Sequence, residues 1–189
     1  MTNRFFTDVI TAQQSRERAR RELQAVASQV LSRSKRVIFK LQRGENTEAA
    51  SDLKDIGGMI VAGKKIVGRD AALSHEGVWR AALEEATEAM LFERFLLKGS
   101  LDGLKLPTDD PEILVGGMSD FIGELARFAV LRATEGDDAA VERFYAMAES
   151  IIEALLQLDL TGGLRSKFDQ AKQHLRKLED IRYDMSERL

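Results

Sequence analysis

The sequence predicts an all-α protein. Ala, Leu, Glu, Lys, Arg and Gln dominate the chain, and these residues favour helices. Apolar residues recur at spacings of three and four, as from Leu164 to Met185, and alternating runs of β-branched residues are few. Only two prolines, Pro107 and Pro111, interrupt the 189 residues. We therefore expect a bundle of about six to seven helices in a single domain, residues 1–189.

Glycines set the expected bounds of the first three helices. The first helix ends at Gly44, and Asn46 can cap the second. The second ends near residue 67, and the third covers about 74–98. An unbroken first helix of roughly 40 residues measures about 60 Å, whereas a compact domain of this length is only about 35–40 Å across. This helix must project, curve around the body or pack against another subunit, and oligomerisation is the simplest solution.

Three more helices are expected after the longest loop, residues 99–110. The segment Asp110-Pro111-Glu112 supplies an N-cap, a proline in the first turn and an acid near the positive end of the helix. This helix ends near Gly136, and Asp137 caps the next one. Residues 161–163 then separate that helix from the last.

The composition limits the chemistry that the chain can support. It has no cysteine, which excludes disulfides and thiolate metal sites, and only two histidines, His75 and His174. Any metal must therefore be held mainly by oxygen, which favours magnesium, manganese or calcium. The net charge of −3 excludes little, because lysines and arginines can still line one surface. No run of 18 apolar residues occurs and the first residues lack an apolar signal segment, so we expect a cytoplasmic protein without a membrane partner.

Two pairs of acids share helix faces. Glu85 and Glu88 are three residues apart on the third helix, and Asp120 and Glu124 are four apart on the fourth. If these helices pack side by side, four carboxylates converge, and a bound cation must then neutralise them. The alternative is a solvated helix face, because acid pairs at these spacings are common. Apolar neighbours such as Phe121 favour convergence, because a carboxylate at the edge of a core is costly unless it is paired or binds a metal.

Four segments resemble the translin/TRAX family, in the family's order. The third-helix segment Glu85-Ala-Thr-Glu88-Ala-Met-Leu-Phe92 resembles an "E-(F/Y)-x-E-A-x-x-F" helix. The fourth-helix segment Gly117-Met-Ser-Asp-Phe-Ile-Gly-Glu-Leu-Ala-Arg127 is similar to "G-x-x-(D/E)-L-x-G-E-L-x-R". Residues 32–45 are similar to the end of the family's long first helix, and residues 164–189 to its basic C-terminal helix.

The resemblance implies a translin-like helical bundle with a long N-terminal helix, which assembles with others, typically eight, into a hollow shell. Family members bind single-stranded nucleic acid. The TRAX branch cleaves RNA with Mg²⁺ held by acids that correspond to Glu85, Glu88, Asp120 and Glu124. The expected metal is therefore Mg²⁺, with Mn²⁺ as the alternative. The full acidic set argues for TRAX-like chemistry, with Glu88 and Asp120 as the preferred direct ligands.

Two departures from the family pattern affect the expected packing. Ala86-Thr87 replaces an aromatic-aliphatic pair between the first two acids and can alter packing behind the metal. Gly57, Gly58 and Gly63 lie inside the second helix, where good helix formers are usual, and put its regularity in doubt.

Basic residues give the expected nucleic-acid contacts. Lys35, Arg36 and Lys40 are the candidates for holding phosphates without reading sequence, whereas most other basic residues are expected on solvated faces. Arg127 is expected to pair with an acid one turn away. We expect both histidines to be bystanders rather than ligands. The only tryptophan, Trp79, is expected in a core or interface.

Three functions remain open from the sequence. The first is a Mg²⁺-dependent endoribonuclease that acts mostly on single-stranded RNA inside a homo-oligomeric, octameric shell. The second is a catalytically silent shell that binds single-stranded RNA or DNA, as translin does. The third is a structural helical bundle whose acids only decorate the surface.

Overall fold

The computed structural model describes residues 3–187, and within this range it is entirely helical with irregular connections and no β-strand. The elements are α1 (Arg4–Gln42), α2 (Asn46–Val67), the 3₁₀ helix η1 (Ala71–His75), α3 (Gly77–Lys98), α4 (Pro111–Thr134), α5 (Asp138–Leu155) and α6 (Gly162–Ser186). The predicted all-α class is confirmed.

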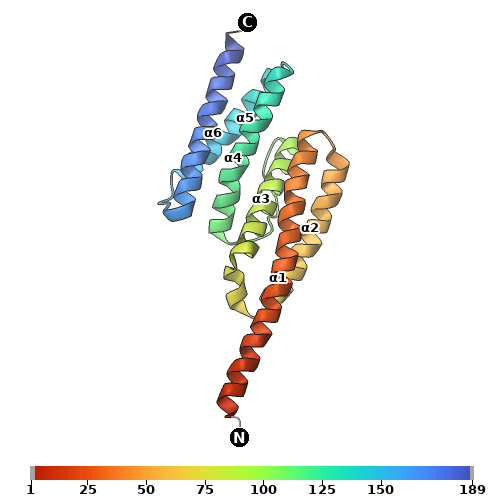
Figure 1. Cartoon of the computed structure of the whole chain (residues 1–189). Helices are drawn as coiled ribbons and strands as arrows, with labels where there is room; N and C mark the ends of the chain where they lie inside the picture. Colours follow the sequence, from red (N-terminus) through yellow and green to blue (C-terminus); the bar gives the residue numbers. More distant parts are fainter. Residues whose placement is uncertain (1–2, 188–189) are drawn as a thin grey trace.

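The helices form two groups joined by the contact between α3 and α4. One group contains α1, α2 and α3, and the other contains α4, α5 and α6. Figure 1 shows α1 and α2 on one side of the molecule, α5 and α6 on the other, and α3 and α4 between them. Edge-to-face and stacked phenylalanines of α3, α4 and α5 fill the core at this junction, with Phe92 and Phe121 fully buried.

Several predicted helix ends are present. The side chain of Asp110 accepts hydrogen bonds from the backbone N–H groups of Glu112 (3.0 Å) and Ile113 (3.4 Å), so it caps α4 as expected. Asp137 accepts one from the N–H of Ala140 (3.0 Å) and caps α5. Gly44 follows α1 with φ of 76°, a conformation that glycine adopts without strain.

Two predicted starts differ from the structure. Asn46 is the first residue of α2 rather than its cap, and the preceding Glu45 makes no side-chain capping bond. The third helix does not begin near residue 74, because the Asp70 carboxylate accepts from the N–H of Ala72 (3.1 Å) and starts η1 instead. Glu76 is then extended and α3 begins at Gly77.

The glycines inside the second helix do not interrupt it, and one of them permits a close contact with Trp79. α2 is unbroken across its glycines. A Cβ atom at Gly63 would overlap the Trp79 ring, so this glycine lets α2 approach α3 closely. Trp79 is only 3% exposed, which confirms the expected core position.

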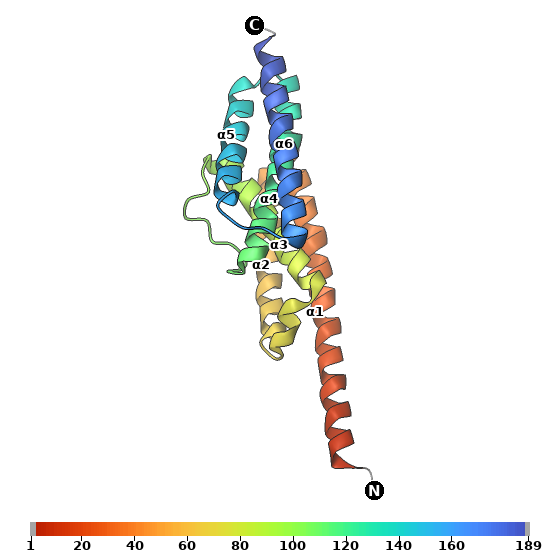
Figure 2. The ribbon, with the colours of Figure 1, turned by 90° about the vertical axis from the view of Figure 1, so that its left-hand side faces the viewer.

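The N-terminal part of α1 projects from the body. Every described residue before Ala19 is exposed, and both Figure 1 and Figure 2 show this end of α1 extending well past the other helices. Ion pairs of Arg16 with Asp70 (2.5 Å) and Arg20 with Glu76 (2.8 Å) hold α1 where it leaves the body. Within residues 3–187, no helix is both long and apolar enough to cross a membrane.

Candidate functional site

Two glycines bring α4 close to α3. A Cβ atom at Gly117 would lie 2.8 Å from Cγ2 of Thr87, and one at Gly116 would overlap the carboxylate of Glu84. Both glycines are buried, so the helices approach here because no side chain separates them. Thr87 belongs to the Ala86-Thr87 pair that departs from the family pattern. Its side chain fills this contact, and its hydroxyl donates a hydrogen bond to the Leu83 carbonyl (2.8 Å).

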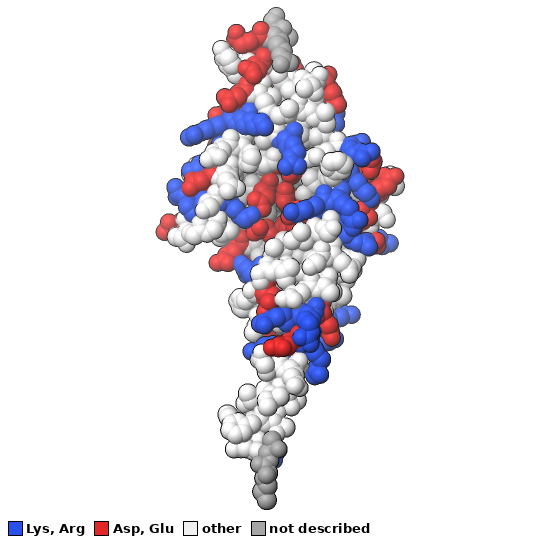
Figure 3. Space-filling view, viewed as in Figure 1, with Lys and Arg blue, Asp and Glu red and all other residues white. Residues whose placement is uncertain are grey.

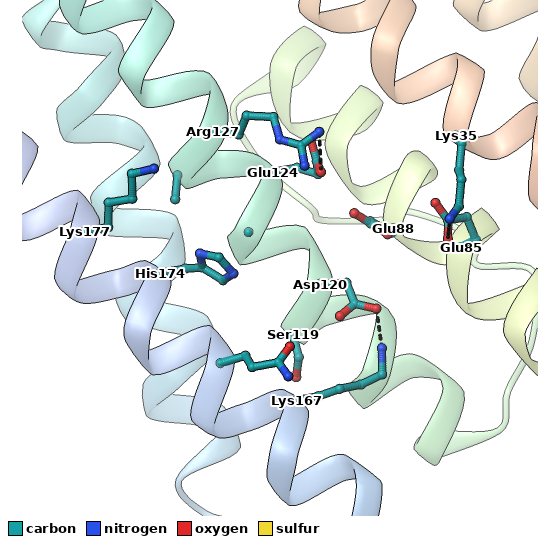
Figure 4. Close-up of a pocket in the computed structure, with 13 residues that line it drawn as sticks. Lys35, Glu85, Glu88, Ser119, Asp120, Glu124, Arg127, Lys167, His174 and Lys177 are labelled. Atoms are coloured by element: carbon teal, nitrogen blue, oxygen red, sulfur yellow. Dashed lines mark hydrogen bonds and ion pairs between the residues drawn. The ribbon is translucent and has the colours of Figure 1, made fainter.

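All four acids predicted from the sequence line one cavity of about 480 Å³. Figure 4 shows Glu85 and Glu88 of α3 on one side and Asp120 and Glu124 of α4 on the other. Side chains from α1 and α6 complete the lining, which consists of Lys35, Glu85, Glu88, Ser119, Asp120, Gly123, Glu124, Ala126, Arg127, Lys167, Gln170, His174 and Lys177. In the space-filling view, acidic atoms lie in the middle of this face with basic groups around them (Figure 3).

Three of the four acids have a charged partner. Asp120 pairs with Lys167 (2.5 Å) and Glu85 with Lys35 (3.8 Å). Glu124 lies 3.5 Å from Arg127, which confirms the pairing expected for this arginine. The Glu124 carboxylate also accepts a hydrogen bond from Gln42 of α1 (2.6 Å). Among residues 3–187, no side chain pairs with Glu88.

The unpaired acid is also the most buried of the four. Glu88 is 7% exposed, and burial raises its pKa to about 9, with further contributions from the negative charges of Glu85, Asp120 and Glu124. Burial likewise raises the pKa of Glu85 and of Glu124. Glu88 is therefore protonated at neutral pH unless added positive charge enters the cavity.

The four carboxylates offer the type of ligand atom that a hard divalent cation binds. The donor set consists of carboxylate oxygens whose mutual repulsion a divalent charge would relieve, which is the chemistry that Mg²⁺ prefers. In the described part of the chain, however, no three Asp, Glu or His side chains are arranged to hold one ion together. Lys167 and Arg127 already engage Asp120 and Glu124, so a metal ion would have to displace these pairs.

The three residues predicted to hold phosphates lie in different surroundings in the structure. Lys35 lines the cavity. Arg36 is exposed on α1 outside the lining, and Lys40 pairs with Asp52 of α2 (2.7 Å). Of the two histidines expected to be bystanders, His75 is exposed in η1, whereas His174 lines the cavity.

Sequence reasoning missed the contribution of α6. Lys167, Gln170, His174 and Lys177 follow one another at spacings of three, four and three, so they share one face of α6, and all four line the cavity. Their polar periodicity was visible in the sequence, but only the packing of α6 against α4 shows that this face meets the acids. Glu84, which pairs with Lys167 (2.8 Å), was also absent from the predicted site, because the family pattern contains its neighbour Glu85 instead.

The fold and the cavity define an all-helical protein in which two adjacent helices carry paired carboxylates beneath a basic rim. The model of the Translin family matches residues 14–188, and the chain belongs to this family. This confirms the resemblance at the level of the family, while the TRAX-like branch stays a prediction.

Solved structures share the fold at low sequence identity. The crystal structure of AfC3PO has a TM-score of 0.88 and 23% identity, with 96% of each chain covered. The complex of AfC3PO with duplex RNA has a TM-score of 0.82, 22% identity and 96% coverage of each chain. The crystal structure of apo-NeC3PO has a TM-score of 0.84, 17% identity and 98% coverage of each chain. A comparison with curated proteins finds no match.

Proposed function

We propose that this chain is a Mg²⁺-dependent endoribonuclease subunit that works in a homo-oligomeric, octameric shell. The observation that carries the proposal is the convergence of Glu85, Glu88, Asp120 and Glu124 on one cavity. Membership of the Translin family and the existence of an RNA complex of AfC3PO support a role in RNA binding. Single-stranded RNA is the proposed substrate, and duplex RNA is the comparison to make because AfC3PO was solved with it.

The chain's own residues would perform distinct tasks in this reaction. Glu88 and Asp120 are the proposed direct ligands, with Glu85 and Glu124 completing the site. A bound Mg²⁺ would supply Lewis-acid charge for the scissile phosphate and lower the pKa of an attacking water. Since Glu88 is protonated without added positive charge, it must release its proton when it becomes a ligand.

The basic rim is suited to hold the phosphates on either side of the cut. Lys35, Arg127 and Lys177 reach the cavity from α1, α4 and α6, so they surround its acidic floor from three directions. Such contacts position a nucleic acid without selecting its sequence. Binding to the rim and chemistry at the floor are therefore separable functions.

The test of the proposed activity is isosteric removal of one negative charge. Glu88→Gln or Asp120→Asn should lower Mg²⁺-dependent cleavage of labelled RNA by at least about a hundredfold, because the amide is a far weaker ligand for a divalent cation. Assembly and RNA binding should stay nearly intact. Glu153→Gln, on an exposed position of α5, is the matched control and should cleave as the wild type does. Full activity in both cavity variants would falsify the assignment of the metal site.

A catalytically silent nucleic-acid-binding shell is the second candidate. It is favoured by the ion pairs of Lys167 and Arg127, which already neutralise two of the acids. Wild-type protein that binds RNA yet never cleaves it, with Mg²⁺ or Mn²⁺ at any concentration, would select this alternative.

RNA binding itself should weaken steeply with salt. Each phosphate contact releases condensed counterions, so affinity for single-stranded RNA should fall with a slope of about −0.7 per contact in a plot of log K against log salt. Lys35→Gln should reduce this slope by about that amount. Lys54→Gln is the matched control, since Lys54 is exposed on α2 and lies outside the cavity lining. Equal effects of the two changes would mean that the cavity rim is not the binding surface.

A further inference from the structure

Lys167 connects acids on two different helices. Its ammonium lies 2.5 Å from Asp120 of α4 and 2.8 Å from Glu84 of α3. These are distances of charge-assisted hydrogen bonds. Two carboxylates from two helices hold this ammonium as a cation. A positive charge therefore already lies within contact of a proposed metal ligand.

The Lys167 side chain lies at the boundary of two cavities. Asp120 lines the acidic cavity, whereas Glu84 lines a second cavity of about 620 Å³, and Lys167 lines both. Figure 4 shows the lysine reaching Asp120 from α6. The second cavity thus provides open space beside Glu84, outside the set of four acids, toward which the ammonium can move without leaving its second partner.

The position of Glu84 depends on a glycine of the facing helix. Its carboxylate occupies the space that a Cβ atom at Gly116 would fill. The Glu84 side chain is 23% exposed, so it is partly withdrawn from water and has Lys167 as its charged partner. The contact between α3 and α4 therefore provides a second carboxylate for Lys167, outside the proposed ligand set.

We infer that Lys167 is a built-in counter-cation of the acidic cavity, which neutralises Asp120 in the metal-free protein and moves onto Glu84 alone when a divalent cation binds. The inference rests on the proposed function, because it concerns the same carboxylates. Two positive charges compete for Asp120, so Lys167 weakens metal binding. Glu84 strengthens metal binding, because it keeps the displaced ammonium paired and spares it an unpaired position in a half-buried site. The two residues together set the metal concentration at which the site fills.

Mn²⁺ binding to the full-length protein tests this inference without reference to activity. Titration calorimetry, or the electron paramagnetic resonance signal of free Mn²⁺, gives the Kd for the wild type and each variant. Lys167→Met should bind Mn²⁺ about tenfold more tightly, since it removes the competing charge. Lys167→Arg keeps the charge and should match the wild type. Glu84→Gln should bind about tenfold more weakly, and in the double variant most of this Glu84 effect should disappear, because Glu84 acts through Lys167.

The outcomes separate this inference from the proposed function. If the wild type binds Mn²⁺ and Lys167→Met binds it equally or less tightly, Lys167 is only a structural link between α6 and the α3–α4 pair, and the inference is overturned. If the wild type binds no Mn²⁺, the proposed metal site fails first. Should Lys167→Met lack a cooperative melting transition, Glu84→Gln alone decides, because an unchanged Kd in that variant also overturns the inference.

Discussion

Glu88 is buried among three other carboxylates, and its raised pKa connects the stability of the fold to pH. The folded-state pKa is about 9, against an ordinary value of 4.5. Between these values the folded protein holds a proton that the unfolded chain has released. The stability that this difference contributes is complete below about pH 4.5 and is lost as pH rises through 9.

Metal-free protein should therefore become less stable as pH rises from about 5 to 9. One group contributes a slope of at most about 1.4 kcal/mol per pH unit to the free energy of unfolding. The raised pKa values of Glu85 and Glu124 act in the same direction. Burial lowers the pKa of His174, which acts against the trend only below about 6.5, and the lowered pKa values of three aspartates matter only near 3.8 and below, namely Asp70, Asp110 and Asp169. Urea denaturation in a chelator at several pH values measures the slope.

Glu88→Gln should flatten that dependence and melt no lower than the wild type at pH 8. Excess Mg²⁺ should restore stability to the wild type at high pH but not to the variant, since only the wild type keeps the ligand charge. A wild type whose stability does not change between pH 5 and 9 would contradict the burial of an ionisable carboxyl at this position.

The acids and the local partner Arg127 could be predicted from the sequence, whereas the partners from other helices could not. Helical periodicity alone places Glu85 beside Glu88 and Asp120 beside Glu124, because such spacings share a face. That Lys167 meets Asp120 depends on how α6 packs on α4, across 47 residues of chain. The same holds for Lys40, whose pairing with Asp52 no local pattern indicates.

At the scale of the helices, glycine has opposite effects at two positions of α2. Gly63 faces the Trp79 ring without room for a side chain, whereas a Cβ atom at Gly57 would meet nothing within 4 Å. Gly63→Ala should destabilise the fold by about 1–3 kcal/mol, because the buried ring must shift. Gly57→Ala should stabilise it by up to about 1 kcal/mol through helix propensity. Chemical denaturation compares the two, and a stabilising Gly63→Ala would show that α2 and α3 are not closely packed here.

Helix bounds could be predicted where side-chain chemistry acts locally. The Asp110 cap and the Gly44 terminus depend only on nearby backbone groups, and both occur where expected. The start of the third helix depended on a competition between two local structures. Asp70 caps a 3₁₀ turn whose Leu73 is 1% exposed, and burial of this leucine favours that turn over an earlier start of α3.

At the scale of the whole molecule, α1 exposes an apolar surface that no other part of residues 3–187 covers. Its apolar residues Phe5, Phe6, Val9 and Ile10 are 66%, 57%, 51% and 55% exposed. Their spacing places them on one face of the helix. In Figure 3 the end of α1 beyond the charged groups is largely free of Lys, Arg, Asp and Glu. An exposed, uncharged helix face of this kind is typical of surfaces that pack against another chain.

The sequence predicts an oligomer well above a dimer, held largely by the first helix and by the apolar stripe of the last, from Leu164 to Met185. The structure packs that stripe of α6 into the chain's own core, so α1 remains the expected contact. Size exclusion coupled to light scattering should therefore give a mass several times the 21.1 kDa of one chain. Val9→Asp with Ile10→Asp should lower that mass, because each change places a charge in the apolar face, and burying an unpaired charge is costly. Thr11→Asp is the matched control, since Thr11 is also exposed but lies on the opposite face of α1. A wild-type mass near 21.1 kDa would refute the assembly, and equal masses for the double variant and the control would place the interface elsewhere.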